Sequence, residues 1–169
     1  EYAIPHKMRG RIKYSEPPKS TPKVARIEDV QAMFEVAAEG DLGIRNRAIL
    51  MFILDTGCRA AGVCGLRVSD LDIPGRRAFV TEKGNKTRAI IFTALTAKLL
   101  RDWMRVRQTA LNVLYNIRTL MALTTSGLYQ LFVRLGEEAG VEGHCHPHSF
   151  RHLFATTYLL RGGNIAALS

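Results

Sequence analysis

The sequence lacks the features that would place a protein in a membrane or outside the cell. It has no apolar run of the roughly 20 residues that a bilayer-spanning helix needs, and no charged-then-apolar secretory start. Its cysteines, Cys58, Cys64 and Cys145, are odd in number and lack the spacing of a disulfide framework. These absences favour reduced thiols, and we therefore expect a cytoplasmic protein.

Acidic residues are also scarce. The 169-residue chain carries 15 Asp and Glu against 24 Lys and Arg, a formal net charge of +9. Such an excess favours a polyanionic partner, nucleic acid or a membrane surface, although it can also serve solubility alone. The 47% hydrophobic content suffices for one domain with a sizeable core. Because the first residue is Glu1 rather than Met, we expect a piece of a longer chain.

The first 26 residues have the composition of a linker. They contain four prolines, lack helical periodicity, and carry seven basic residues against two acidic ones. We interpret residues 1–26 as a basic interdomain linker whose Arg9, Arg11 and Lys13 follow a DNA backbone. A merely solvated linker explains the same charge equally well.

From Ile27 onward the pattern is mainly helical. An apolar stripe predicts a helix that begins near Ile27 and is broken by the glycines at 40 and 43. Residues 46–54 follow, and within them residues 48–54 are apolar on every side. A helix of that kind is a buried core element.

An arginine follows closely on this core helix. Gly57 is expected to turn the chain, and Arg59 then stands at the start of a short helix over residues 60–66. An Arg so close to a buried segment is held in place, although on position alone a helix-terminal Arg without a task is as common. Residues 68–72 are predicted to form a loop.

A β-hairpin is predicted next. Residues 77–81 and 88–92 are rich in β-branched and aromatic side chains, and they flank the turn sequence Glu-Lys-Gly-Asn-Lys-Thr. Lys83 and Lys86 lie at its tip, where a lysine can reach a substrate as a movable ammonium donor. For an isolated hairpin, an ordinary solubilising turn is the commoner explanation.

Two more helices are expected before the last motif. Thr93 should cap one whose buried face includes Leu95 and Trp103. Residues 105–123 are assigned to a helix or a loop. Residues 124–126 offer several N-caps for the second helix.

The segment Pro-His-Ser-Phe-Arg-His at residues 147–152 carries the most informative chemistry. Pro147 suits a first helical turn, and His148, Arg151 and His152 then lie three and four positions apart on one face. A guanidinium matches phosphate oxygens with its fork of donors, and an imidazole can move a proton near neutral pH. Taken alone, such a pair is most often a surface Arg beside a His that is hydrogen-bonded within the protein and has no catalytic role.

Four passages are more specific together than any one alone. They are Thr-Gly-Cys-Arg at 56–59 with Val-Ser-Asp-Leu-Asp at 68–72, the hairpin turn at 82–88, the helix from 125 to 141, and His-Ser-Phe-Arg-His at 148–152. In this order and spacing they resemble the catalytic domain of the tyrosine recombinases, the phage-integrase family of site-specific DNA recombinases. The resemblance covers about residues 27–169. It implies an α+β fold, predominantly helical, with a small antiparallel β-sheet.

The resemblance also implies a chemistry that needs no metal or cofactor. A tyrosine hydroxyl attacks a DNA phosphate and forms a 3′-phosphotyrosyl link, which a 5′-hydroxyl later resolves. Arg59 and Arg151 would hold the non-bridging oxygens. Lys83, with Lys86 as the fallback, would protonate the leaving 5′-oxygen. His148 would assist proton transfer at the nucleophile or orient the phosphate.

Further roles follow from the same resemblance. His152 matches a second family histidine with a supporting role, and Arg88 is expected to contact DNA together with the linker arginines. The implied partner is double-stranded DNA. A homotetramer is implied at synapsis when the protein is full length.

Two departures from the family pattern bear on activity. Gly62 stands where the family usually has an acidic residue, which leaves Arg59 without that carboxylate. The family's Leu-Gly-His or Leu-Gly-Trp motif and its tyrosine nucleophile would come after Ser169. The tyrosines present lie upstream, in the linker-like segment or in expected helices, and none should replace it: Tyr2, Tyr14, Tyr115, Tyr129 and Tyr158. We therefore expect that the fragment does not cleave DNA by itself.

Two other functions fit parts of the sequence. One is a non-catalytic DNA-binding relative, in which Gly62 and the missing C-terminal motif mark decay. The other is a metal-binding regulator that uses the three imidazoles and the thiol of residues 144–148 for zinc or copper. The metal hypothesis is the weaker one, because no second cluster supplies the remaining ligands at a proper spacing.

Overall fold

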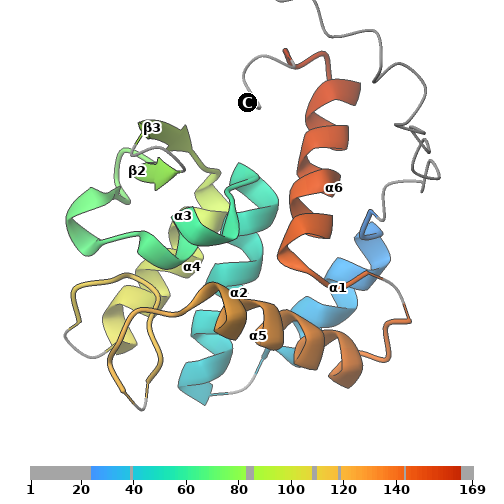
Figure 1. The fold of residues 1–169 in the computed structure, drawn as a ribbon, viewed down its shortest axis with the longest axis horizontal. Coiled ribbons are helices and arrows are strands. Elements are labelled where there is room, and N and C mark those ends of the chain that lie inside the picture. Colours follow the sequence, from blue (N-terminus) through green and yellow to red (C-terminus); the bar gives the residue numbers. More distant parts are fainter. Residues whose placement is uncertain are drawn as a thin grey trace, which may run out of the picture.

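The computed structural model describes residues 24–38, 40–82, 86–107, 110–117, 119–142 and 144–164. These residues form a mainly helical fold with one small antiparallel sheet, as predicted (Figure 1). The elements, in chain order, are α1 (Ile27–Val36), α2 (Gly40–Thr56), α3 (Ala60–Gly65), a 3-10 turn (Val68–Asp70), β1 (Leu71–Asp72), β2 (Arg77–Glu82), β3 (Lys86–Ile91), α4 (Ala94–Val106), α5 (Thr125–Glu138) and α6 (Pro147–Leu160).

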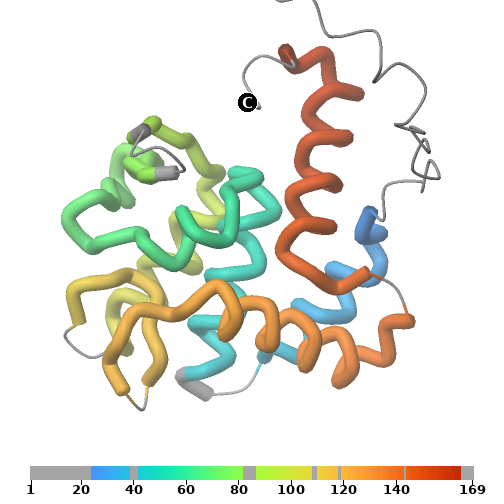
Figure 2. The backbone as a smooth tube through the Cα atoms, viewed as in Figure 1, coloured from blue at the N-terminus to red at the C-terminus, as the bar shows by residue number. Residues whose placement is uncertain are grey.

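Helix α2 is the centre of the core. It is 17 residues long, and its Ile49, Leu50 and Ile53 side chains are fully buried. Helices α4 and α6 pack against it, and in Figures 1 and 2 it lies between the sheet and α6. An apolar helical segment is stable only when neighbours cover it, and α4 and α6 cover much of this one, while Met51 and Leu54 line a groove. None of the helices in the described ranges has the length and apolar character needed to cross a membrane.

The glycines before this helix behave differently from the prediction. Helix α1 ends at Val36, and α2 begins at Gly40 and includes Gly43, so Gly43 does not break a helix. A Cβ atom at Gly43 would lie 2.8 Å from the carbonyl oxygen of Ala37. Glycine is therefore needed there for close approach of the preceding turn rather than for helix termination.

The sheet has three antiparallel strands in the order β1-β2-β3. Strands β2 and β3 form the predicted hairpin, with Arg77 paired to Ile91 and Glu82 paired to Lys86. The assignment of residues 68–72 to a loop was wrong, because Leu71 and Asp72 pair with β2 as a third strand. A strand of two residues is too short for a period-of-two pattern to reveal it.

The described residues between 107 and 123 (110–117 and 119–122) are held to the core without forming a helix. The indole Nε1 of Trp103 donates a hydrogen bond of 2.8 Å to the carbonyl of Val113, and Arg45 Nη1 donates one of 3.0 Å to that of Tyr115. Tyr115 pairs with Ala122 in an isolated bridge, so its predicted place in a helix was wrong. These side chains donate to backbone carbonyls that have no partner within a helix or a sheet.

Helices α4 and α5 begin as the capping pattern predicts. The hydroxyl of Thr93 accepts from the backbone N–H of Thr96, and that of Thr124 accepts from Gly127 at 3.0 Å. One expectation about the buried face of α4 was wrong, since Leu95 is 52% exposed. Its side chain lines an open groove, whereas Trp103 on the same helix is fully buried.

All three cysteines are buried, and each keeps its thiol outside a disulfide. Burial raises the pKa of the Cys64 thiol to about 11, and it also raises the pKa of Cys145. Because the thiolate is the reactive form, these thiols are structural rather than catalytic.

Candidate functional site

The turn between α2 and α3 is built around Gly57. Its φ of +58° lies in the left-handed region that favours glycine. A Cβ atom at this position would overlap the ring of Phe154 on α6. The bare Cα of Gly57 therefore lets α6 pack directly against the end of α2.

Arg151 ties α6 to the same turn. Its Nη1 donates a hydrogen bond to the carbonyl oxygen of Gly57, although the two residues are 94 positions apart in the chain. Arg59 follows two residues after Gly57 as the exposed N-cap residue of α3. The structure thus anchors one predicted phosphate-binding arginine on the turn that carries the other.

Arg151 also lines a hollow of about 280 Å³ between α6, the end of α2 and the hairpin. The described residues around it include two arginines and no Asp or Glu: Thr56, Arg88, Ala89, Ile90, Ile91, Arg151, Phe154 and Tyr158. Guanidinium groups that line a hollow without carboxylates suit an anion with several oxygens, and a phosphate is such an anion.

The histidines of α6 lie beside this arginine on exposed positions. Both His148 and His152 are exposed, whereas Ser149 and Phe150 between them are buried. The ring of Phe150 meets Phe132 of α5 edge-on, with centroids 4.9 Å apart. This packing turns the opposite face of α6, with the imidazoles, towards solvent.

Several predicted residues lie outside the part of the chain that the structure describes. Lys83 and the linker residues Arg9, Arg11 and Lys13 are among them. Lys86 is placed by its backbone, which pairs with Glu82 in the last strand pair before residues 83–85. Gly62, which stands where the family usually has an acidic residue, is buried in α3.

The histidine and cysteine cluster before α6 does not form a set of metal ligands. The rings of Tyr129 and His146 stack with centroids 4.7 Å apart, and His144 lies 6.5 Å from His146 by the same measure. Within the described ranges, no group of three or more His, Cys, Asp or Glu side chains is placed to hold a metal ion. The cluster therefore gives no support to the metal-binding hypothesis.

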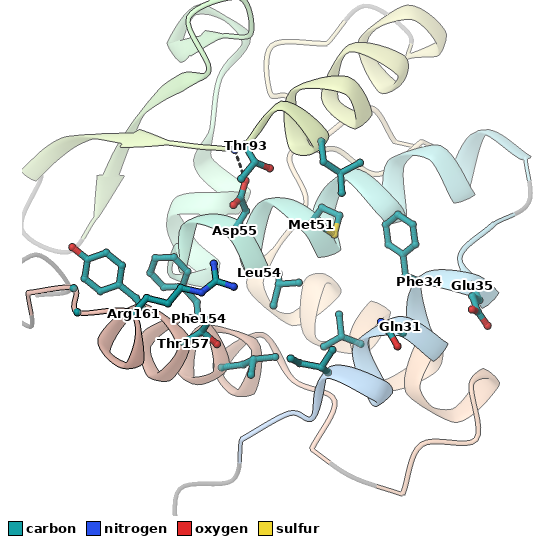
Figure 3. Close-up of a pocket in the computed structure, with 17 residues that line it drawn as sticks. Gln31, Phe34, Glu35, Met51, Leu54, Asp55, Thr93, Phe154, Thr157 and Arg161 are labelled. Atoms are coloured by element: carbon teal, nitrogen blue, oxygen red, sulfur yellow. Dashed lines mark hydrogen bonds between the residues drawn. The ribbon is translucent and has the colours of Figure 1, made fainter.

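A larger groove of about 1010 Å³ lies between α1, α2, the start of α4 and α6 (Figure 3). Apolar side chains such as Met51 and Leu54 form much of its wall. At one end, the Asp55 carboxylate accepts a hydrogen bond of 2.5 Å from the backbone N–H of Thr93, and Glu35 also lines the groove. Arg161 lines the groove as well, but the apolar wall and the two carboxylates suit a phosphate less than the smaller hollow at Arg151, which is therefore the candidate site.

The sequence motifs identify Arg59 and Arg151 but not the contacts with Gly57 that position them. Nothing in the local pattern pairs Phe154 or Arg151 with Gly57, because both contacts join distant segments. The Thr-Gly-Cys-Arg sequence predicted a turn, which was the available signal. The contribution of Thr56 and Tyr158 to the hollow was also not predicted.

Comparison with known proteins supports a shared ancestry for most of the chain. The sequence model of the phage integrase family matches residues 23–169. The tyrosine recombinase XerC of Alcanivorax borkumensis is 29% identical over 157 residues, which are 89% of this chain and 51% of the relative. XerC of Listeria innocua is 30% identical over 154 residues, 85% of this chain and 51% of the relative. The chain therefore spans about half the length of the curated relatives it matches.

Solved structures show the same fold. The XerA recombinase superposes with a TM-score of 0.76 at 27% identity, covering 92% of this chain and 56% of that one. XerH bound to its difH substrate superposes with a TM-score of 0.72 at 24% identity, covering 87% of this chain and 45% of that one. The Tn1549 transposon integrase in complex with circular intermediate DNA superposes with a TM-score of 0.74 at 20% identity, covering 89% of this chain and 58% of that one. The last two, at these identities, show likeness of fold alone.

We expect Gly57→Ala to destabilise the fold more than the matched variant Gly140→Ala. Both glycines have positive φ, +58° and +64°, so each substitution costs about 1–2 kcal/mol of backbone strain. At Gly140 a new methyl group meets open space, whereas at Gly57 it would overlap Phe154. Overpacking should add roughly 1–3 kcal/mol at Gly57 alone, measured by urea unfolding. Equal losses for the two variants would show that Phe154 does not pack on this glycine.

Proposed function

Because the chain belongs to the phage integrase family, we propose that it is part of the catalytic domain of a site-specific DNA recombinase. In this proposal the whole protein acts in the cytoplasm on double-stranded DNA. It cleaves and rejoins strands through a 3′-phosphotyrosyl intermediate. The observation that carries the proposal is the anchoring of Arg151 on the Gly57 turn, beside a hollow lined by arginines. The XerH and Tn1549 structures, which are complexes with DNA, support the choice of partner.

The two arginines are proposed to hold the phosphate under attack. Arg59 and Arg151 bind its non-bridging oxygens and stabilise the charge that grows on the five-coordinate phosphorus. Arg151 is held in place before DNA binds. It lies on α6, which packs against α2, and its guanidinium donates a hydrogen bond to the Gly57 carbonyl. Groups held in place before the reaction need no reorganisation when charge develops, and this is where electrostatic catalysis gains most.

Proton transfer is assigned to the hairpin and to α6. Lys83 protonates the leaving 5′-oxygen, with Lys86 as the fallback. His148, exposed one helical turn before Arg151, assists proton transfer, and His152 has a supporting role. The protons balance without a metal or cofactor, because His148 takes the proton from the attacking tyrosine hydroxyl while Lys83 gives one to the leaving 5′-oxygen.

The nucleophile is proposed to lie outside the 169 residues. Of the described tyrosines, Tyr158 lines the hollow with Arg151, but its ring stacks on Phe154 with centroids 5.9 Å apart. Tyr115 is buried in the core, and Tyr129 stacks on His146. These rings take part in packing, and Tyr2 and Tyr14 belong to the proposed linker. We therefore propose that the attacking hydroxyl comes from another segment.

The division of the chain is also a proposal. Residues 1–26 form a basic interdomain linker, with Arg9, Arg11 and Lys13 on the DNA backbone, and residues 27–169 belong to the catalytic domain. The family match, which begins at residue 23, supports a boundary in this region. The full-length protein is proposed to assemble as a homotetramer at synapsis.

We expect the chain to bind duplex DNA with an affinity that falls steeply as salt rises, because phosphate contacts release counterions. Arg59→Ala and Arg151→Ala should each weaken binding by about tenfold or more, since each removes a charged hydrogen-bond donor. Arg101→Ala, which removes the same charge from an exposed position on α4, is the matched control and should bind nearly as well. Fluorescence anisotropy with a labelled duplex, with helix content followed by circular dichroism, measures this. Equal affinities for all three variants would rule out the phosphate site.

We expect Lys83→Ala to slow strand cleavage by about 100-fold or more in the full reading frame that contains this chain, as loss of a general acid does. Lys86→Ala, the matched neighbour on the same hairpin, should have a small effect. A substrate with sulfur in place of the leaving 5′-oxygen should restore the Lys83→Ala rate, because a thiolate departs without a proton. Rescue of Lys86→Ala instead would transfer the role to Lys86.

A further inference from the structure

Asp55 stands at a place in α2 where a carboxylate is locally unfavourable. It lies in the last turn of this helix, where the helix dipole has its partial negative charge. The same turn contains no basic residue that would offset the repulsion. A residue that breaks a local rule in this way is expected to bring a gain elsewhere in the fold, and the hydrogen bonds of Asp55 show where.

The carboxylate of Asp55 bonds to the start of α4. Its Oδ2 accepts a hydrogen bond of 2.5 Å from the backbone N–H of Thr93 (Figure 3). The same oxygen accepts a second one, of 2.8 Å, from Thr96 Oγ1. The cap that Thr93 supplies from its own helix is longer, since its Oγ1 lies 3.4 Å from the amide nitrogen of Thr96. A helix N-terminus carries partial positive charge, so α4 provides the favourable partner that the end of α2 does not.

This contact also holds the base of the β-hairpin. The N–H of Phe92 donates a hydrogen bond of 3.0 Å to the carbonyl of Arg76, which continues the pairing of β2 with β3. The next N–H, that of Thr93, donates to Asp55 instead. Phe92 also lies against Phe52, one helical turn before Asp55, with ring centroids 6.0 Å apart. Consecutive residues thus join the sheet to the end of α2.

The other side of Asp55 leads to the arginines. Gly57, whose carbonyl accepts the hydrogen bond from Arg151, comes two residues later, and Arg59 comes four residues later. One carboxylate therefore connects the turn that carries the proposed phosphate-binding groups with the base of the hairpin. We propose that Asp55 is a positioning residue for protonation of the leaving 5′-oxygen. Through Thr93, it sets where the hairpin stands relative to the phosphate.

This inference rests on the proposed function, in which the proton comes from the hairpin and the phosphate is held by the arginines. A general acid works only within hydrogen-bond reach of the atom that it protonates, so its rate depends strongly on where its strand is anchored. The arginines, by contrast, hold the phosphate without the hairpin. Loss of Asp55 should therefore slow cleavage when the leaving group needs a proton, and only then.

Single-turnover cleavage by the full reading frame that contains the chain tests this, at saturating protein and with two cognate duplexes. One duplex has the natural 5′-oxygen at the cleavage point, and the other has sulfur, which departs without a proton. Asp55→Ala should cleave the oxygen substrate about tenfold more slowly than the wild type, less than the roughly 100-fold that a 1 Å displacement can cause. It should cleave the sulfur substrate at the wild-type rate.

Three further variants separate positioning from general damage. Asp55→Asn keeps one acceptor oxygen, so its rate on the oxygen substrate should lie between those of Asp55→Ala and the wild type. Thr96→Val removes one donor, and adding it to Asp55→Ala should cost nothing more, because both changes remove the same contact. Asp102→Ala is the matched control on α4, where this carboxylate lies 3.5 Å from Arg105 Nη1, and it should match the wild type on both substrates.

The outcomes distinguish this inference from the proposed function. Equal slowing of Asp55→Ala on both substrates would mean that Asp55 supports the arginines or the fold at large, and would overturn the positioning role. Wild-type rates on both substrates would overturn it too, with the proposed function intact. If the wild type itself cleaves neither substrate, the proposed function fails and the inference fails with it. Should Asp55→Ala unfold, Asp55→Asn and Thr96→Val take its place, and the same rescue by sulfur is expected.

Discussion

The close packing of α6 on the Gly57 turn fixes where the charged groups of this domain lie. The glycine adopts a left-handed conformation, its bare Cα meets the ring of Phe154, and its carbonyl accepts a hydrogen bond from Arg151. On the other side, Asp55 at the end of the same helix accepts a hydrogen bond of 2.8 Å from Thr96 Oγ1 at the start of α4. The turn that leads to Arg59 is thus held by two helices at once, and they set its position.

The high positive charge of the chain overstates the number of arginines that can meet a phosphate. Arg45 is 7% exposed and bonds to the Tyr115 carbonyl, and its burial lowers the pKa of the guanidinium. Arg107 donates to the carbonyls of Ala110 and Asn112, and Arg26 bonds to Asp29, which lowers the pKa of that carboxyl. These arginines maintain loops and caps. Arg88 and Arg151 line the hollow instead, and Arg151 also donates to the Gly57 carbonyl.

Local patterns predicted most of the elements but not the contacts that join them. The apolar stretch of α2, the threonine caps and Pro147 were sufficient to place helices, because each acts within a turn or two. Strand β1 was missed since it has two residues, and Tyr115 was misplaced because its segment is held by distant side chains. Resemblance identified Arg59 and Arg151 as a pair. Their common anchor at Gly57, and the approach of Arg88 to the same hollow, depend on tertiary packing that no single motif encodes.

The claim that this fold positions arginines for a phosphotyrosyl reaction can be tested most directly with the full reading frame that contains the chain. Incubated with a nicked duplex that carries its cognate site, the protein should form a covalent DNA adduct that survives a denaturing gel. The adduct should persist in Tyr158→Phe, because that ring forms part of the wall of the hollow, and it should be lost in Arg151→Ala. Absence of any adduct, with duplex binding intact, would contradict the account and indicate a DNA-binding relative without catalytic activity.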